Sequence, residues 1–267
     1  MDKKTLIIFG IIFSVSTVVA YDYFNRIDRP NLKIRIEVQQ SIITGTSDSP
    51  YRYRILVPFL TEAASKKLLS FMEYPDAFQI SYAVYDFCAI FFILLTLYIY
   101  LNIWWTKEQS LIGCLFASAT ITIALRDHYF QPWSLLETAL FTLSLVLIYK
   151  EYYGLLCLVI IIATLNKETA IFIPLAYFFT RIDLKNKTTL YHKHIFLICI
   201  FFLIWLIPFL ILRYLLLGIS PHIHSMKELF TYNWTAVSAN RAVLNVWLFL
   251  GFFWVFAVLE SSMPQIL

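Results

Sequence analysis

The stretch AFQISYAVYDFCAIFFILLTLYIYLNI, from Ala77 to Ile103, decides the fold. It holds 27 residues and one charged side chain, Asp86. A helix needs about 20 apolar residues to cross a hydrocarbon layer about 30 Å thick, so this stretch is long enough to span a membrane. The sequence therefore predicts a transmembrane helix here.

Similar apolar runs recur along the chain. Of its residues 60% are hydrophobic and 14% charged, and the mean hydropathy is +0.72. This composition excludes a water-soluble globule. The sequence predicts an all-α, polytopic transmembrane helical bundle of about eight spans, with residues 1–267 forming a single integral membrane domain. The predicted spans are Thr5 to Phe24, Ala77 to Ile103, Ser110 to Leu125, Trp133 to Tyr149, Tyr153 to Leu165, Thr169 to Thr180, His194 to Leu217 and Val243 to Leu259.

The charges give the orientation. The net charge of +4 is modest and the basic residues are spread along the chain, so no nucleic-acid partner is expected. Eight Lys and Arg residues fall in the termini and short loops that are inside if the N-terminus is cytoplasmic, against only Arg126 and Lys167 in the short outer turns. The N-terminus is therefore predicted inside, and residues 25–76 form the first extracytoplasmic loop.

That outer loop is predicted to hold two amphipathic surface helices. The first runs from Leu32 to Thr44, with Ile36 and Ile42 on its apolar face, and Gly45 is its expected stop. The second begins at Pro58. Its predicted apolar side holds Leu60, Ala64, Leu68 and Met72, and its polar side holds Glu62, Lys66 and Lys67. Both helices are expected to lie along the membrane surface, in contact with its lipids.

Ionisable residues inside the spans gather toward the outer side. Asp22, Glu137 and Arg213 fall near outer ends, where the alternative is that Asp22 and Arg213 snorkel to the interface. Asp86 is expected roughly 13 Å deep, where an isolated charge costs about 2.5 to 3.5 kcal/mol. It therefore needs a buried partner or a function. The pattern predicts a dry inner half and a polar outer cavity.

Three outer motifs carry candidate chemistry. In Tyr51-Arg52-Tyr53-Arg54, the guanidinium groups of Arg52 and Arg54 suit the phosphate of an anionic lipid, unless the segment is only an interfacial anchor. In the next outer turn, Arg126, Asp127 and His128 supply the parts of an acid–base and anion-binding site, unless they form a solvated turn.

The third motif is Asn166-Lys167-Glu168-Thr169, which joins two short apolar runs. It is tolerated at membrane depth only where it lines protein or water. The alternative is a tight hairpin in which Lys167 and Glu168 neutralise each other. Arg241, in the last outer loop, is a further candidate phosphate contact. No protein-bound metal site is predicted, because His222 and His224 alone are a poor signal and the four cysteines lie far apart in apolar runs.

Together these features resemble the GT-C superfamily of membrane glycosyltransferases, in its bacterial branch of dolichyl-phosphate-mannose mannosyltransferase-like proteins. The shared features are the large first outer loop, the Tyr51 to Arg54 motif running into Pro58, Asp127 with Gln131-Pro132, and the Asn166 to Thr169 motif. Members of the superfamily use a polyprenyl-phosphate sugar on the outer face. Relatives usually continue through more helices, so the resemblance implies a shortened member, located in the bacterial cytoplasmic membrane.

The resemblance implies a carboxylate in the first outer loop as catalytic base, and Asp48 and Glu37 are the candidates, while Asp127 and His128 would orient the acceptor or hold an optional divalent cation. The expected partners are a polyprenyl-phosphate-linked sugar and a lipid or glycan acceptor. Arg52, Arg54, Lys167 and Arg241 would stabilise the leaving phosphate. Two other functions stay open. One is a carrier or flippase for a lipid-linked or anionic solute, and the other is a noncatalytic subunit of a glycan assembly complex.

Overall fold

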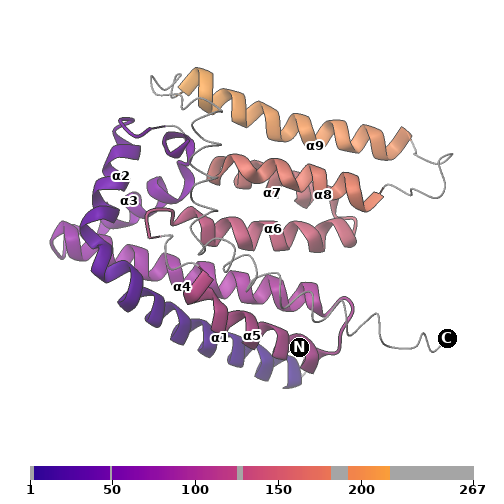
Figure 1. Ribbon diagram of the computed structural model, residues 1–267, viewed down its shortest axis with the longest axis horizontal. Helices are drawn as coiled ribbons and strands as arrows, with labels where there is room; N and C mark the ends of the chain where they lie inside the picture. The colour runs from indigo at the N-terminus through magenta and orange to yellow at the C-terminus, as the bar shows by residue number, and fades with distance from the viewer. Residues whose placement is uncertain (1–2, 49, 125–128, 182–191, 217–267) are drawn as a thin grey trace, which may run out of the picture. The chain divides into compact units, whose positions relative to one another are not determined.

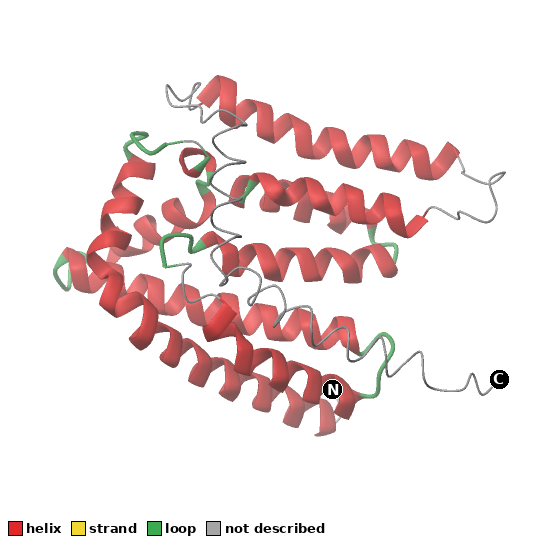
Figure 2. Ribbon diagram, viewed as in Figure 1, coloured by secondary structure: helices red, strands yellow, loops and turns green. Residues whose placement is uncertain are grey.

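The computed structural model describes residues 3–48, 50–124, 129–181 and 192–216. The chain divides into two compact units, Met1–Ser220 and Pro221–Leu267, and all the described residues belong to the first. Every regular element in them is a helix, with no strand (Figure 2). The all-α prediction is therefore confirmed for this part of the chain.

A helix lies at each of the first seven predicted spans, and the eighth falls outside the described residues. The helices are α1 (Lys3–Tyr23), α4 (Tyr74–Leu101), α5 (Lys107–Ala124), α6 (Trp133–Tyr149), α7 (Tyr153–Asn166), α8 (Phe172–Arg181) and α9 (His192–Leu210). Three helical stretches are long and apolar enough to cross a membrane, namely Lys3–Ile43, Tyr74–Leu101 and His194–Tyr214. Helices α6 and α7 are apolar but shorter.

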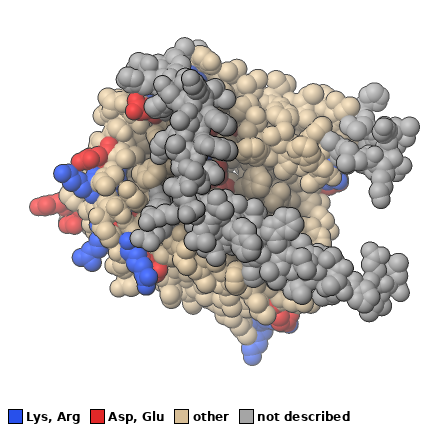
Figure 3. All heavy atoms as spheres, in the orientation of Figure 1, with Lys and Arg blue, Asp and Glu red and all other residues tan. Residues whose placement is uncertain are grey.

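Helix α4 is the centre of the packing. It contacts α1, α5 and α6, and α6 leads on through α7 to α9 (Figure 1). Large apolar side chains also face outward, among them Val18 (67% exposed), Ile112 (65%) and Phe196 (65%). On the side shown in Figure 3, the charged side chains of the described residues gather mainly toward the ends of the helices, and the described surface that is visible between them is almost uncharged. This distribution suits helices surrounded by hydrocarbon.

Two ion pairs lie at the end of the helices that holds the N-terminus. Lys4 pairs with Glu108, and the hydrogen bond from its ammonium group is the main cause that lowers the pKa of Glu108. Arg181 Nη2 lies 3.0 Å from Glu151 Oε1 and also donates to the Ile148 carbonyl. All four residues lie at the ends of helices or in the turns between them.

The predicted outer loop, residues 25–76, folds at the opposite end, as α2 (Leu32–Ile43) and α3 (Leu56–Leu68). Between them Tyr51–Tyr53 forms one 3-10 turn, η3. The predicted stop after the first helix is confirmed, because Gly45 adopts a φ of +70° just beyond Ile43. Helix α1 continues through a π-helical turn, η1 (Phe24–Asp28), so that α2 follows almost directly from the first predicted span.

The predicted apolar side of α2 is confirmed in part, because Ile42 is buried and Ile36 packs against the same cluster. The same helix also buries the polar residues Arg35 and Gln39. Helix α3 buries Thr61 and Glu62, whereas Leu60 and Ala64, on its predicted apolar side, are exposed, Leu60 to 58%. An exposed apolar side is compatible with the expected contact between this helix and membrane lipids.

A buried hydrogen-bond network explains why α2 and α3 bury these polar residues. The Gln39 amide donates to Glu62 Oε2 at 2.9 Å, and Gln39 Oε1 accepts from Thr61 at 3.0 Å and from the Tyr82 hydroxyl at 2.5 Å. The Tyr74 hydroxyl also donates to Glu62, at 2.9 Å. Because these groups satisfy one another, the polar sides of α2, α3 and α4 pack together.

Candidate functional site

The first and third motifs meet in an ion pair. Arg54 follows η3, and Glu168 begins the short 3-10 helix η4 (Glu168–Ile171). Arg54 donates to both carboxylate oxygens of Glu168, through Nε at 3.2 Å and Nη2 at 2.5 Å. The Arg54 guanidinium, 5% exposed, also lies 5.0 Å from the Tyr51 ring centroid and 5.2 Å from that of Trp133. This bidentate geometry fixes the guanidinium plane.

A second ion pair is formed by Lys167, the residue directly before Glu168. Lys167 adopts an extended backbone after α7, and its ammonium lies 2.6 Å from Glu137 Oε2 on α6. The Thr169 hydroxyl donates to the other oxygen of Glu137, and Asn166 donates to the Trp133 carbonyl at 2.9 Å. The hairpin in which Lys167 and Glu168 neutralise each other is therefore wrong, because each binds a residue of another element.

Arg213 is the third cation at this end. It lies in the π-helical segment η6 (Ile211–Leu216), with its guanidinium 4.8 Å from the ring centroids of Tyr53 and Phe209. Among the described residues it has no carboxylate partner, and its buried Nε has no hydrogen-bond partner. Arg213 lines a small hollow together with Glu168, Tyr53 and Thr164, and we call it the Arg213 hollow.

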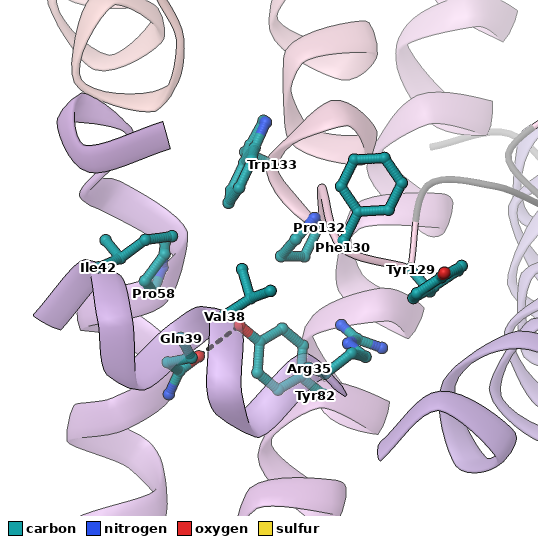
Figure 4. A pocket seen from close by; sticks show the side chains of 10 residues that line it. All are labelled: Arg35, Val38, Gln39, Ile42, Pro58, Tyr82, Tyr129, Phe130, Pro132 and Trp133. Atoms are coloured by element: carbon teal, nitrogen blue, oxygen red, sulfur yellow. Dashed lines mark hydrogen bonds between the residues drawn. The ribbon is translucent and has the colours of Figure 1, made fainter. Parts of the chain in front are cut away.

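A second hollow lies beneath α2, and we call it the Trp133 hollow (Figure 4). One wall consists of rings from the segment before α6, and the other comes from α2, α3 and α4. Its lining residues are Arg35, Val38, Gln39, Ile42, Pro58, Tyr82, Tyr129, Phe130, Pro132 and Trp133. Aromatic faces beside one amide and one guanidinium suit a ligand with both apolar and hydroxyl surfaces.

Behind the Trp133 hollow lies a buried charge cluster formed by Asp28, Arg35 and Asp86, which are 3%, 4% and 0% exposed. Arg35 contacts the Asp28 carboxylate directly, and its Nη1 lies 3.8 Å from Asp86 Oδ2. The Arg35 guanidinium also stacks 4.0 Å from the Tyr82 ring centroid. The prediction that Asp86 has a buried partner is confirmed.

The candidate bases of the outer loop do not join these groups. The side chains of Glu37 and Asp48 are exposed. Arg52 is half-buried, and its backbone N–H donates to the Asp48 carbonyl at 3.2 Å. Arg126, Asp127, His128 and Arg241 lie outside the described residues. Within the described ranges no three His, Cys, Asp or Glu residues stand together as metal ligands.

The sequence pattern does not single out Asp28 and Arg35, although they are seven residues apart on a nearly continuous helical path, a spacing that puts two side chains on one face. Arg213 stands out in the sequence only for its position near the predicted outer end of a span. Its lack of a carboxylate partner among the described residues is visible only in three dimensions.

No protein-family model, curated protein or solved structure matches this chain. The class of the protein therefore rests on its residues and their geometry.

Proposed function

We propose that the chain is a polytopic membrane glycosyltransferase of the GT-C type, which transfers a sugar from a polyprenyl-phosphate donor to a lipid or glycan acceptor at the outer face of the membrane. One observation carries the proposal: Glu168 and Arg213, from distant segments, line the Arg213 hollow, and Arg54 pairs with Glu168. A hollow at the end of apolar helices, lined by an arginine with no carboxylate partner among the described residues, suits a ligand that has a phosphate head and a hydrocarbon tail.

The charge balance favours an anion. Arg54, Lys167 and Arg213 bring three positive charges, and Glu137 and Glu168 bring two negative ones, so one positive charge is left over. Arg213 supplies that excess. Guanidinium groups bind phosphate oxygens in bidentate geometry, and in a water-poor site this attraction is stronger than in bulk solvent.

In the proposed reaction, the donor phosphate competes with Glu168 for Arg54. Glu168, released from the guanidinium, accepts the proton of the acceptor hydroxyl. The hydroxyl oxygen bonds to the anomeric carbon, the bond between that carbon and the phosphate oxygen breaks, and its electron pair leaves on the lipid phosphate. Arg54 and Arg213 stabilise this developing charge. Asp127 stays an alternative base, and Glu168 replaces the exposed Glu37 and Asp48 in our assignment.

The Trp133 hollow is the proposed sugar site. Trp133 links the two hollows. It lines the Trp133 hollow, and its ring stacks against the Arg54 guanidinium. Arg54 in turn pairs with Glu168, which lines the Arg213 hollow. Sugar rings offer C–H faces to aromatic side chains and hydroxyls to groups such as the Gln39 amide. This arrangement would set the anomeric carbon between the rings and the phosphate.

Membrane orientation gives the first test. We expect a membrane-impermeant maleimide to label Asp48→Cys on intact cells, and Glu108→Cys only after permeabilisation, because the proposed topology puts α2 outside and the α4–α5 turn inside. Both variants are made after Cys88, Cys114, Cys157 and Cys199 are replaced by Ser, and this cysteine-free chain is the control. The opposite labelling pattern would reverse the proposed active face.

The activity test uses the purified full chain in nanodiscs with a radiolabelled polyprenyl-phosphate sugar and a mixture of envelope lipids and glycans. We expect label in the acceptor and release of lipid phosphate. In proteoliposomes, a carrier would instead move the intact labelled lipid between leaflets, and a noncatalytic subunit would bind it without transfer. Either of these outcomes would refute the proposal that the chain is a glycosyltransferase.

A further inference from the structure

The buried charge cluster is unbalanced. Asp28 and Asp86 are two carboxyl groups, and among the described residues Arg35 is the one guanidinium that pairs with them. If both carboxyl groups were ionised, the cluster would carry one uncompensated negative charge in a region that is at most 4% exposed. An unpaired buried charge costs several kcal/mol, so this state is strongly disfavoured.

Arg35 is also the one donor group beside the two carboxyl groups among the described residues. Neither oxygen of Asp86 has a hydrogen-bond partner there, and Asp28 has only its contact with Arg35. Two ionised carboxylates only accept hydrogen bonds, so two of them buried beside one guanidinium are favourable only when one of them carries a hydrogen.

The other polar groups around the cluster do not supply that hydrogen. The Tyr82 hydroxyl donates to Gln39, and the Tyr85 hydroxyl donates to the Pro132 carbonyl at 2.8 Å. Tyr23, from α1, is buried within electrostatic reach of both carboxyl groups. The titratable groups that face Asp86 from α1, η1, α2 and α4 are Asp28, Arg35 and these three tyrosines.

We propose that Asp28 and Asp86 bind one proton between them and form, with Arg35, an electrically neutral proton-binding site behind the Trp133 hollow. The bound proton supplies the missing hydrogen bond and cancels the excess charge. Arg35 belongs to both the cluster and the lining of the hollow, and Tyr82, which stacks on its guanidinium, also lines the hollow. These two residues are therefore the path by which the site exchanges protons with the outer side. The proposal is independent of the proposed glycosyl transfer.

Infrared spectroscopy of the purified full chain tests the proposal. A protonated carboxylic acid has a carbonyl stretch distinct from that of a carboxylate, and the band shifts in D₂O. We expect this band at neutral pH in the unmodified protein. It should vanish in Asp86→Asn and in Asp28→Asn, because the remaining carboxylate then balances Arg35. Asp48→Asn, at an exposed site, is the matched control and should leave the band unchanged.

Folding is checked by the melting temperature. Asn has nearly the shape of a protonated Asp, so Asp86→Asn should melt within a few degrees of the unmodified chain. Three results would overturn the proposal: no band in the unmodified chain at neutral pH, a band that survives both Asn substitutions, or a melting temperature that rises with Na⁺ but not with K⁺ of equal concentration. The last result would mean that a metal ion, not a proton, balances the cluster.

Discussion

Replacing Arg213 by Gln should lower kcat/KM for sugar transfer by about 10- to 100-fold. The reason is that a hydrogen bond to a charged group contributes about 1.5–3 kcal/mol, and about 1.4 kcal/mol corresponds to one factor of ten. Arg213 has no carboxylate partner within the described residues. Its removal therefore takes the counter-ion from none of their buried carboxylates. The measurement is the transfer rate over a range of donor concentrations.

Two variants make this result specific. Arg213→Lys keeps the charge but not the bidentate geometry and should lose less activity than Arg213→Gln. Lys67→Gln removes an equal charge from the exposed side of α3 and should change transfer less than twofold. If Arg213→Gln transferred sugar at the unmodified rate, the phosphate site would not lie in the Arg213 hollow. Arg54 is a poorer probe, because its removal also leaves Glu168 unpaired.

The second large effect is expected at Arg35. Arg35→Met should lower the free energy of unfolding by about 3–5 kcal/mol, because removing one partner of a buried ion pair leaves the other without a counter-ion. Methionine fills similar space, so the loss is mainly electrostatic. The measurement is the unfolding of the purified chain in mixed micelles with increasing denaturing detergent.

The control for Arg35 is Arg26→Met. Arg26 pairs with Asp22 at 2.6 Å, but its side chain is 75% exposed. An exposed pair of this kind contributes at most about 1 kcal/mol. The triple variant with Arg35→Met, Asp28→Asn and Asp86→Asn removes every charge of the cluster and should recover most of the lost stability. Equal losses for Arg35→Met and Arg26→Met would show that the cluster does not stabilise the fold.

The helices of this chain could be predicted from sequence because their signal is local. An apolar run long enough to bury its backbone hydrogen bonds must be helical in hydrocarbon, and turn residues bound each run. For that reason the bounds of α6, Trp133–Tyr149, agree with the prediction residue for residue. The same argument gave α7 to within one residue at its end.

The orientation of α2 and α3 could not be predicted in the same way. Apolar periodicity indicates a buried face only when the other face meets water. Here Gln39, Glu62 and Tyr82 form hydrogen bonds with one another across three helices. The polar sides of these helices are therefore buried, and Leu60 is exposed. Those partners are up to 43 residues apart in sequence, and no local pattern links them. The pairing of Arg54 with Glu168, 114 residues apart, was missed for the same reason.

The position of Arg35 also has a consequence for biogenesis. Asp86 belongs to a helix that is synthesised after α2, so its counter-ion has already emerged when α4 enters the bilayer. If the proposed topology holds, α4 settles in lipid only when the translocated segment folds back and delivers its guanidinium. A nascent chain stalled before that step would expose a lone acid to lipid, and this is the stage at which quality-control proteases would recognise variants of Arg35.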